Sequence, residues 1–480
     1  MYVEQLYTNC LAEAAYYIES DGEAIVIDPI REIESYLAMA ESRNAKIKYV
    51  LETHFHADFV SGHLDLAQAT GAEIVFGPGA ETSYAIHQAY DGEILEVGSV
   101  RIEVLHTPGH TPESTCYLLY DESGKPHALF SGDTLFVGDV GRPDLLGGTL
   151  TKETLAAMMY DSLTTKIKPL PDDVIVYPAH GPGSACGKNI GKETWSTIGI
   201  QKQTNYALRD MTREVFIAAL TTGLAAPPRY YFKDAVINKH GSSPLKDILA
   251  RNVRALSIEE FDKATGHSAL VLDVRTPEDF EKGHIPGSLN IGLDGTYAWW
   301  AGTLIDIATP LVIVAPPGRE EEAVRRLARI GYENVRGYLA GGFETWLSSG
   351  QPVTTVVSIE PSEFSELYGR GTAVLDVRNT GEFENGHIEG ALNIPLGILE
   401  SRLSELKRNR YYLVHCAGGY RSMIASSILA RHGFEHIQNV HGGFATLKHF
   451  AQDIIARQEV RYDSPGAVFF VGPPSLNYSR

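Results

Sequence analysis

An internal repeat in the second half of this 480-residue chain limits what the chain can fold into. Residues 271–293 match residues 374–396 at 15 of 23 positions, at an offset of 103 residues. A period near 100 is too long for a solenoid repeat and is the size of a small domain. The sequence therefore predicts two tandem copies of one domain, which we place at residues 253–352 and 353–455.

Each copy alternates apolar strand patterns with helical patterns. The runs LVLDV and AVLDV open the two copies, and a later run in each is followed by a glycine-containing turn and a helix-like segment. Strands that alternate with helices indicate α/β domains with a mainly parallel sheet.

Residues 1–235 show a different pattern, in which short apolar runs are separated by turn signals and several runs end in His or Asp. This pattern predicts a layered sheet protein that presents polar groups at one edge. We expect one helix from Thr204 to Ala219, a linker at residues 236–252 and a C-terminal tail at residues 456–480.

The composition limits the classes of partner that this chain is expected to bind. The net charge is −19, from 60 acidic and 41 basic residues, which argues against nucleic acid or an anionic membrane as a partner. Four cysteines are too few for a disulfide framework and favour a cytoplasmic protein. Of these, Cys10 and Cys116 lie in or beside apolar strand patterns and are predicted to be buried structural residues.

Several predicted strands of residues 1–235 end in residues that bind metals. These residues are His54 and His56 after YVLET, and His110, Asp133 and His180 after three further strands. Imidazole and carboxylate groups at neighbouring strand ends converge on one point, as a metal requires.

The motifs THFHAD, TPGHT, SGDT and YPAHG, in this order, resemble the metallo-β-lactamase superfamily. The resemblance implies an αββα sandwich in residues 1–235. The usual loop of that superfamily is T-H-x-H-x-D-H, whereas Phe59 stands at the last position here. The second metal position then retains Asp58 and His180, and we expect it to be empty.

Residues 138–145 also resemble the substrate-side loop of the persulfide dioxygenase branch of this superfamily. That resemblance implies one Fe(II) per chain, and two imidazoles with one carboxylate suit non-haem iron and O₂. The implied ligands are His54, His110 and Asp133, with His56, Asp58 and His180 orienting the ligands or bound water.

Two further residues near this site are candidates for contact with the substrate. Arg142 could bind an anionic group of the substrate. Cys186 follows His180 by six residues and is a candidate to accept or relay a persulfide.

The segment from Cys416 to Arg421 lies between a predicted strand and a predicted helix. Such a loop directs backbone N–H groups and the positive end of a helix at the cysteine sulfur, which favours thiolate and cradles a persulfide. Arg421 is predicted to stabilise the same anion, and Gly418, Gly419 and Tyr420 to bind the substrate. With Asp376–Arg378 and the Gly-Gly-Phe segment at 442–444, this loop resembles that of rhodaneses.

The first copy carries Val314 where the second carries Cys416, and Pro316 and Pro317 remove backbone donors from its loop. We therefore predict an inactive rhodanese-like domain that acts as a spacer or interaction domain. Together with the tail, it offers surfaces for a homodimer.

The chain as a whole resembles fusions of a persulfide dioxygenase with rhodanese domains. This implies oxidation of a thiol persulfide by O₂ to sulfite and thiol, coupled to sulfur transfer that forms thiosulfate or delivers persulfide. Glutathione, coenzyme A and bacillithiol remain open as the carrier thiol.

Two alternatives are a dinuclear zinc thioester hydrolase of the hydroxyacylglutathione type and a non-enzymatic sulfur-relay scaffold. Phe59 argues against the first, and the intact ligand set and Cys416 loop argue against the second.

Overall fold

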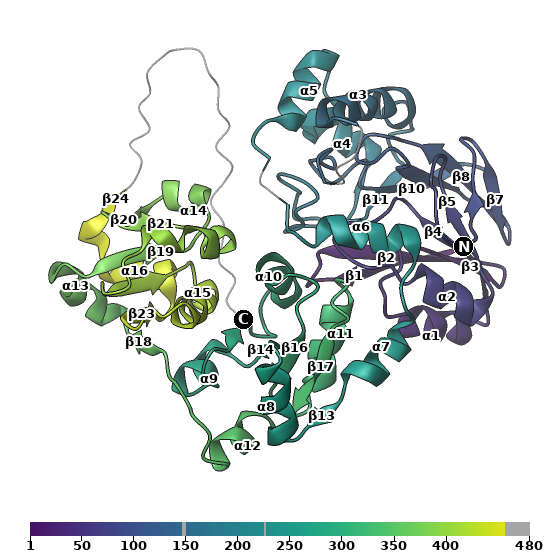
Figure 1. The fold of residues 1–480 in the computed structure, drawn as a ribbon. Helices are drawn as coiled ribbons and strands as arrows, with labels where there is room; N and C mark the ends of the chain where they lie inside the picture. Colours follow the sequence, from purple (N-terminus) through teal and green to yellow (C-terminus); the bar gives the residue numbers. More distant parts are fainter. Residues whose placement is uncertain (146–149, 225–226, 457–480) are drawn as a thin grey trace, which may run out of the picture. The chain divides into compact units, whose positions relative to one another are not determined.

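The computed structural model describes residues 1–145, 150–224 and 227–456, so that the predicted tail beyond Ala456 lies outside the described residues. The chain divides into two compact units, Met1–Thr355 and a second that begins at Val356 (Figure 1). Both units combine helices with sheets, which confirms the predicted α/β class. None of the described helices has the length and apolar character needed to cross a bilayer.

Two six-stranded sheets form the centre of the metal-binding domain. The first has the order β1 (Tyr2–Thr8), β2 (Glu13–Ser20), β3 (Glu23–Ile27), β4 (Lys46–Glu52), β5 (Glu73–Phe76) and β6 (His87–Gln88). The second has the order β12 (Ser196–Thr197), β11 (Ile175–Pro178), β10 (Pro126–Gly132), β9 (Thr115–Tyr120), β8 (Val100–His106) and β7 (Ile94–Val97).

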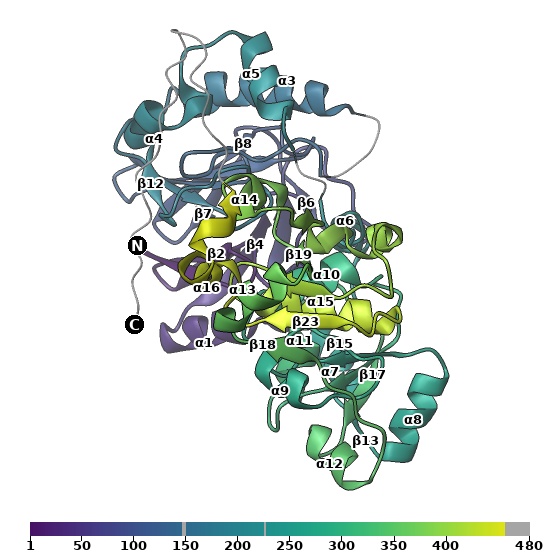
Figure 2. The same ribbon diagram turned by 90° about the vertical axis from the view of Figure 1, so that its left-hand side faces the viewer.

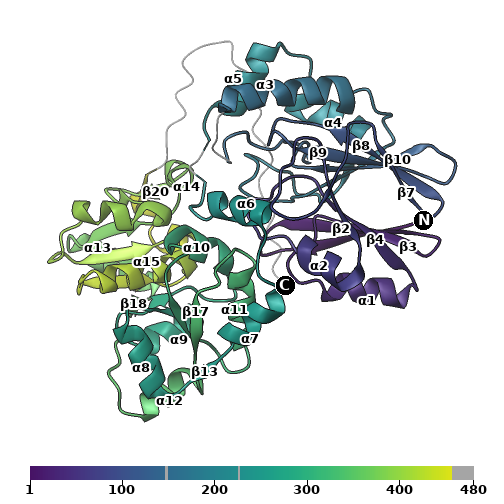
Figure 3. The ribbon, with the colours of Figure 1, turned by 45° about the vertical axis from the view of Figure 1, so that its right-hand side comes forward.

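Helices cover the outer faces of both sheets, which gives the predicted αββα order (Figure 3). The first sheet is covered by α1 (Glu34–Ser42) and α2 (His63–Thr70). The second is covered by α3 (Lys152–Ser162), the π-helical turn η1 (Leu163–Ile167), α4 (Ile198–Thr204), the 3₁₀ turn η2 (Tyr206–Leu208) and α5 (Arg213–Thr221). The single helix expected from Thr204 to Ala219 is wrong, because α4 ends at Thr204 and α5 begins only at Arg213.

Alternating side chains of β2 reach two different cores. Tyr16 and Ile18 pack with Phe130 between the sheets, whereas Tyr17 packs outward with Tyr36 of α1. Successive strand residues point to opposite faces, and here both faces are buried. This explains why the strands appear as continuous apolar runs rather than as an apolar–polar alternation.

The two repeat copies form five-stranded sheets of the same topology, and all their strand pairings are parallel, as predicted. The first has the order β13 (Ala255–Leu256), β17 (Val335–Leu339), β16 (Leu311–Val314), β14 (Leu270–Asp273) and β15 (Leu289–Asn290). The second has the order β18 (Val357–Ile359), β23 (Ile437–Val440), β22 (Tyr412–His415), β19 (Ala373–Asp376) and β21 (Leu392–Asn393), and a short pair β20 (His387–Ile388) and β24 (Ile455–Ala456) accompanies it.

The helices of the first copy are α8 (Ile258–Gly266), α9 (Pro277–Lys282), α10 (Tyr297–Leu304), α11 (Glu320–Ala328) and α12 (Gly342–Ser348). Figure 2 shows α8 and α12 beside β13, and Phe261, Phe343 and Trp346 bury one face of this sheet. The second copy contains α13 (Pro361–Gly369), α14 (Thr380–Glu384), η3 (Leu396–Ile398), η4 (Glu400–Glu405), α15 (Tyr420–Arg431), α16 (Gly443–Phe450) and η5 (Gln452–Ile454).

Within residues 1–355, the metal-binding domain and the first copy are joined through two helices and a buried arginine. The expected linker is largely helical, because α6 (Tyr231–His240) and α7 (Leu245–Asn252) occupy most of it. Arg31, which is 1% exposed, donates to the carbonyls of Ala328 and Ser243 and to Glu333 at 2.7 Å. Since a buried guanidinium requires partners, these bonds tie the two domains together.

We expect Arg31→Gln to lower the free energy of unfolding by about 3 kcal/mol, because it breaks a buried ion pair and leaves two carbonyls without a donor. All four tryptophans lie within residues 1–355, so tryptophan fluorescence during urea unfolding of the full chain reports on this unit. The matched control is Arg251→Gln: Arg251 is largely exposed and lies 4.0 Å from the same Glu333, so the expected loss is under about 0.5 kcal/mol. Equal losses in both variants would contradict the role given to Arg31.

Candidate functional site

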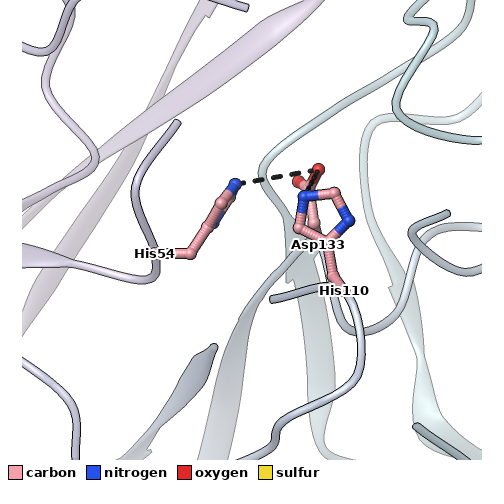
Figure 4. A group of neighbouring side chains, drawn as sticks. All are labelled: His54, His110 and Asp133. Carbon is pink, nitrogen blue, oxygen red and sulfur yellow. Dashed lines mark ion pairs between the residues drawn. The ribbon is translucent and has the colours of Figure 1, made fainter. Parts of the chain in front are cut away.

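Strand ends from both sheets meet at one edge of the αββα sandwich. His54 follows β4, while His110 and Asp133 follow β8 and β10 of the other sheet. Figure 4 shows the His54 ring pointing at the Asp133 carboxylate from one side, with His110 beside Asp133. The Asp133 carboxylate lies 3.3 Å from His110 Nε2 and 3.9 Å from His54 Nε2, and all three residues are buried.

The outer nitrogens of both histidines are already engaged. The Thr53 hydroxyl donates to Asp28 Oδ2 at 2.8 Å, so its oxygen accepts the hydrogen bond from His54 Nδ1 at 2.9 Å. His110 Nδ1 donates to the Arg142 carbonyl at 2.8 Å. Each ring therefore presents an Nε2 lone pair to the centre, the arrangement that metal-binding histidines adopt.

Charges at the centre also fit a metal. Burial, reinforced by the neighbouring histidines, lowers the pKa of His54 well below its ordinary value, which keeps the ring neutral. Neither carboxylate oxygen of Asp133 has a hydrogen-bond partner among the described residues. A buried, unpaired carboxylate is costly, and a cation held by His54, His110 and Asp133 would satisfy it.

His56 lies beside His54 but belongs to a separate cluster of buried carboxylates. Its Nε2 lies 3.1 Å from Asp28 Oδ1 and 3.6 Å from Glu52 Oε2. Burial alone would lower the pKa of His56, but these carboxylates raise it to about 10. His56 is therefore a charged partner of the cluster, and its ring packs 4.3 Å from that of His54.

Asp58, His180 and Cys186 form a second group of buried donors, whose ligand atoms lie within 4.8 Å of one another. His180 Nε2 lies 3.3 Å from Asp58 and 3.5 Å from Asp133, and its Nδ1 donates to the Ala12 carbonyl. Burial and the nearby Asp58 and Asp133 raise the pKa of Cys186 well above its ordinary value. The sequence left only Asp58 and His180 as donors at the second metal position, and the structure adds the sulfur of Cys186.

Arg142 is buried, and its contacts are internal. Its guanidinium binds both carboxylate oxygens of Asp144, at 2.7 and 2.8 Å. Its backbone N–H donates to the Cys186 carbonyl, and its own carbonyl orients His110. Arg142 therefore connects the His110 ligand to the Cys186 loop, and a substrate anion would compete with Asp144 for its side chain.

The Cys416 loop follows β22 and leads into α15. The Gly419 N–H donates to Cys416 Sγ at 3.1 Å, and Gly418 and Tyr420 lie on either side of that donor. Both guanidinium nitrogens of Arg421 bind Glu382, at 2.6 and 2.8 Å, and this contact raises the pKa of Arg421. The sulfur thus lies beside a backbone donor at the start of a helix, as expected of a loop that stabilises thiolate.

The first copy differs at the matching place. Val314 is fully buried at the end of β16, and Arg319 pairs with Glu322 and Asp294. Because an isopropyl group offers no nucleophile, this copy cannot carry a persulfide there.

Sequence analysis missed several residues around the metal centre. Thr53 and Asp28 orient His54, and Asp28 follows β3 directly, so the strand-end signal that identified Asp133 could also have found it. The prediction that Cys10 is buried is wrong: it is partly exposed, and Arg329 of the first copy donates to its sulfur at 3.1 Å. Cys116 is buried as predicted.

Comparison with known families agrees with this architecture. Residues 8–180 match the model of the metallo-beta-lactamase superfamily, and residues 257–349 and 360–449 each match that of the rhodanese-like domain.

Individual relatives match parts of the chain. A solved metallo-beta-lactamase structure from Staphylococcus aureus subsp. aureus COL is 34% identical, with a TM-score of 0.64, over 71% of this chain and 99% of that chain. ETHE1 from Myxococcus xanthus is 30% identical, with a TM-score of 0.43, over 50% of this chain and 98% of that chain. A probable hydroxyacylglutathione hydrolase from Schizosaccharomyces pombe is 36% identical over 35% of this chain and 62% of its own length. The chain spans between 60% and 66% of the length of the first curated relatives it matches.

We expect Thr53→Val to weaken metal binding at His54 by roughly ten- to a hundredfold, because it removes the hydroxyl that joins His54 to Asp28 while keeping the side-chain volume. Competition with a chromogenic chelator measures this affinity directly. Thr115→Val is the matched control, since that buried threonine hydroxyl donates to the Glu113 carbonyl instead. An unchanged affinity in Thr53→Val would show that His54 needs no such support.

Proposed function

Since the chain belongs to the metallo-β-lactamase superfamily and continues into two rhodanese-like domains, we propose that it oxidises a low-molecular-weight thiol persulfide with O₂ and transfers sulfur at Cys416. The observation that carries this proposal is the group His54, His110 and Asp133, present on the same chain as an intact Cys416 loop.

The proposed metal is one Fe(II) ion, held by His54, His110 and Asp133. Iron would supply the redox chemistry by which dioxygen reacts with a sulfur anion, which zinc lacks. Thr53 and the Arg142 carbonyl accept hydrogen bonds from the Nδ1 atoms and so orient the Nε2 atoms of the two imidazoles toward the proposed metal. His180 contacts Asp133 and Asp58, and the ring of the charged His56 packs against the ring of His54.

The proposed reaction is R–S–SH + O₂ + H₂O → R–SH + SO₃²⁻ + 2H⁺. The terminal sulfur is oxidised, dioxygen is reduced, and the bond between the two sulfurs breaks. The carrier thiol is proposed to be of the glutathione, coenzyme A or bacillithiol type.

Sulfur transfer is proposed to occur at Cys416, whose thiolate attacks the terminal sulfur of the carrier persulfide. The bond between the two sulfurs of the carrier breaks, the carrier thiol leaves, and a persulfide forms on Cys416. Attack by sulfite on the outer sulfur then releases thiosulfate and regenerates the thiolate. Support for this role comes from the Gly419 N–H, which donates to the Cys416 sulfur, and from the positive charge of Arg421 near it. Cys186 is a proposed further acceptor, and its raised pKa means that this role requires positive charge beside its sulfur.

We expect His54→Ala to abolish O₂ uptake, because it removes a metal ligand. Cys416→Ser should leave O₂ uptake within about twofold of the wild type and abolish thiosulfate formation, because the two sites act separately. An oxygen electrode and quantification of sulfite and thiosulfate, with glutathione persulfide as substrate, measure both activities. Equal loss of both in Cys416→Ser would contradict two separable sites.

A dinuclear thioester hydrolase is the second candidate function, and the group Asp58, His180 and Cys186 favours it. Phe59 removes one donor of the usual second metal site, but Cys186 supplies another. The similarity to hydroxyacylglutathione hydrolases points the same way.

Metal content separates the two functions. We expect a chelated and reconstituted protein to regain O₂ uptake with about one Fe(II) per chain and to gain none with Zn²⁺, because zinc has no redox chemistry. Elemental analysis alongside the oxygen electrode checks this. Two zinc ions per chain, with thioester hydrolysis and no O₂ uptake, would replace the dioxygenase proposal.

A further inference from the structure

A cavity of about 160 Å³ extends from Asp58, which lies beside the metal centre, to the inactive rhodanese-like domain. The loops at residues 9–12 and 182–185 form part of its wall, together with Tyr231 of the metal-binding side and Trp299 of α10. Asp58 also lines it, and among the described residues the Oδ1 atom of Asp58 has no hydrogen-bond partner. The cavity thus joins the second group of donors, through Asp58, to Trp299 of the first copy.

Helix α10 lies beside α6 (Figure 1), and it packs against the start of that helix. A Cβ atom on Gly302 would lie only 2.3 Å from the ring of Tyr230, so a glycine is required for α10 to approach that ring. The Tyr231 and Trp299 rings meet edge to face at 6.3 Å. These aromatic contacts hold Trp299 against the metal-binding domain.

The active copy has a different segment at the matching place. Residues 400–407 correspond to α10 at the repeat offset of 103, and η4 there has the charged sequence ESRLSE, whereas α10 has the sequence YAWWAGTL. The copy that lacks the nucleophile is therefore the copy that carries an apolar helix at the metal-binding domain.

We infer that the inactive rhodanese-like domain forms part of the substrate pocket of the metal centre, where Trp299 and Tyr231 hold the sulfur-bearing arm of the carrier thiol. The identity of the occupant as a thiol carrier rests on the proposed function. Trp299 is then a specificity-determining residue supplied by a domain without catalysis of its own.

The cavity also limits the chemistry of that arm. Whole-ligand pockets usually measure about 300–1,000 Å³, so this one holds the arm and leaves the rest of the carrier outside. Asp58 is the one charged side chain among the described residues that line it. Since none of these lining side chains is basic, a carboxylate or phosphate would be buried there without a partner, so the arm beside the sulfur is uncharged, as in the amide-linked arms of glutathione and coenzyme A.

Cys10 provides a reporter of occupancy because it lines the same cavity and is partly exposed. In the full-length protein, S-methylglutathione and S-methyl-coenzyme A, which lack a free thiol, should slow alkylation of Cys10 by iodoacetamide roughly fivefold. Peptide mass spectrometry separates Cys10 from the other three cysteines. Trp299→Ala should lose the protection and Trp299→Phe should retain most of it, whereas Trp195→Ala, which alters an exposed tryptophan elsewhere, should match the wild type.

Kinetics provide the second measurement. Trp299→Ala should raise KM for glutathione persulfide or coenzyme A persulfide roughly tenfold while kcat changes by less than about twofold, and Trp299→Phe should recover most of the loss. The inference is overturned if Trp195→Ala loses protection or shows a raised KM, or if Trp299→Ala keeps wild-type protection. It is also overturned if neither probe protects Cys10 in the wild type. Protection of Cys10 requires no O₂ chemistry. Trp299-dependent protection without any O₂ uptake would therefore contradict the proposed dioxygenase activity but support the proposed pocket.

Discussion

The metal centre depends on two sheets that are each buried on both faces. Packing between the sheets is shared by residues such as Tyr16 and Phe130, while helices cover the outer sides. Because this packing fixes how the two sheets lie against each other, the loops after β4, β8 and β10 meet at one edge of the sandwich. His54, His110 and Asp133 lie far apart in the sequence and depend on that common core to meet.

The two candidate sites have opposite electrostatic character. Around the metal centre, Asp58 and Cys186 have raised pKa values because burial disfavours their anions, and a cation would relieve this cost. Around Cys416, by contrast, the Gly419 N–H donates to the sulfur, and the nearby Arg421 carries a positive charge that pairs with Glu382. The acidic groups around the metal centre suit a cation, whereas the donors beside Cys416 suit an anionic sulfur, and each set lies in its own domain.

The sequence allowed prediction wherever a local pattern determines local structure. The repeat predicted two parallel sheets, and strand ends with His or Asp predicted His54, His110 and Asp133 as neighbours, which the structure places together. The sequence did not allow us to predict the contacts that loops make with residues far away in the chain. Cys186 was predicted to lie near the metal site, but its grouping with Asp58 and His180 depends on the course of the loop between β11 and β12, and nothing local marks Trp299 as part of a pocket. The failed helix shows a similar limit, because its apolar spacing gave no sign of the break between α4 and α5.

Arg329 connects the inactive copy to three parts of the metal-binding domain. Its carbonyl accepts the hydrogen bond from Val60, just after the metal-binding loop, and its guanidinium binds Glu32 and Cys10. A protein truncated after residue 252 would therefore lose these contacts and the part of the cavity wall that Trp299 forms, although it would keep His54, His110 and Asp133. The duplicated domain carries no nucleophile at the matching place, yet it supplies packing that the metal-binding domain of this chain would lack without it.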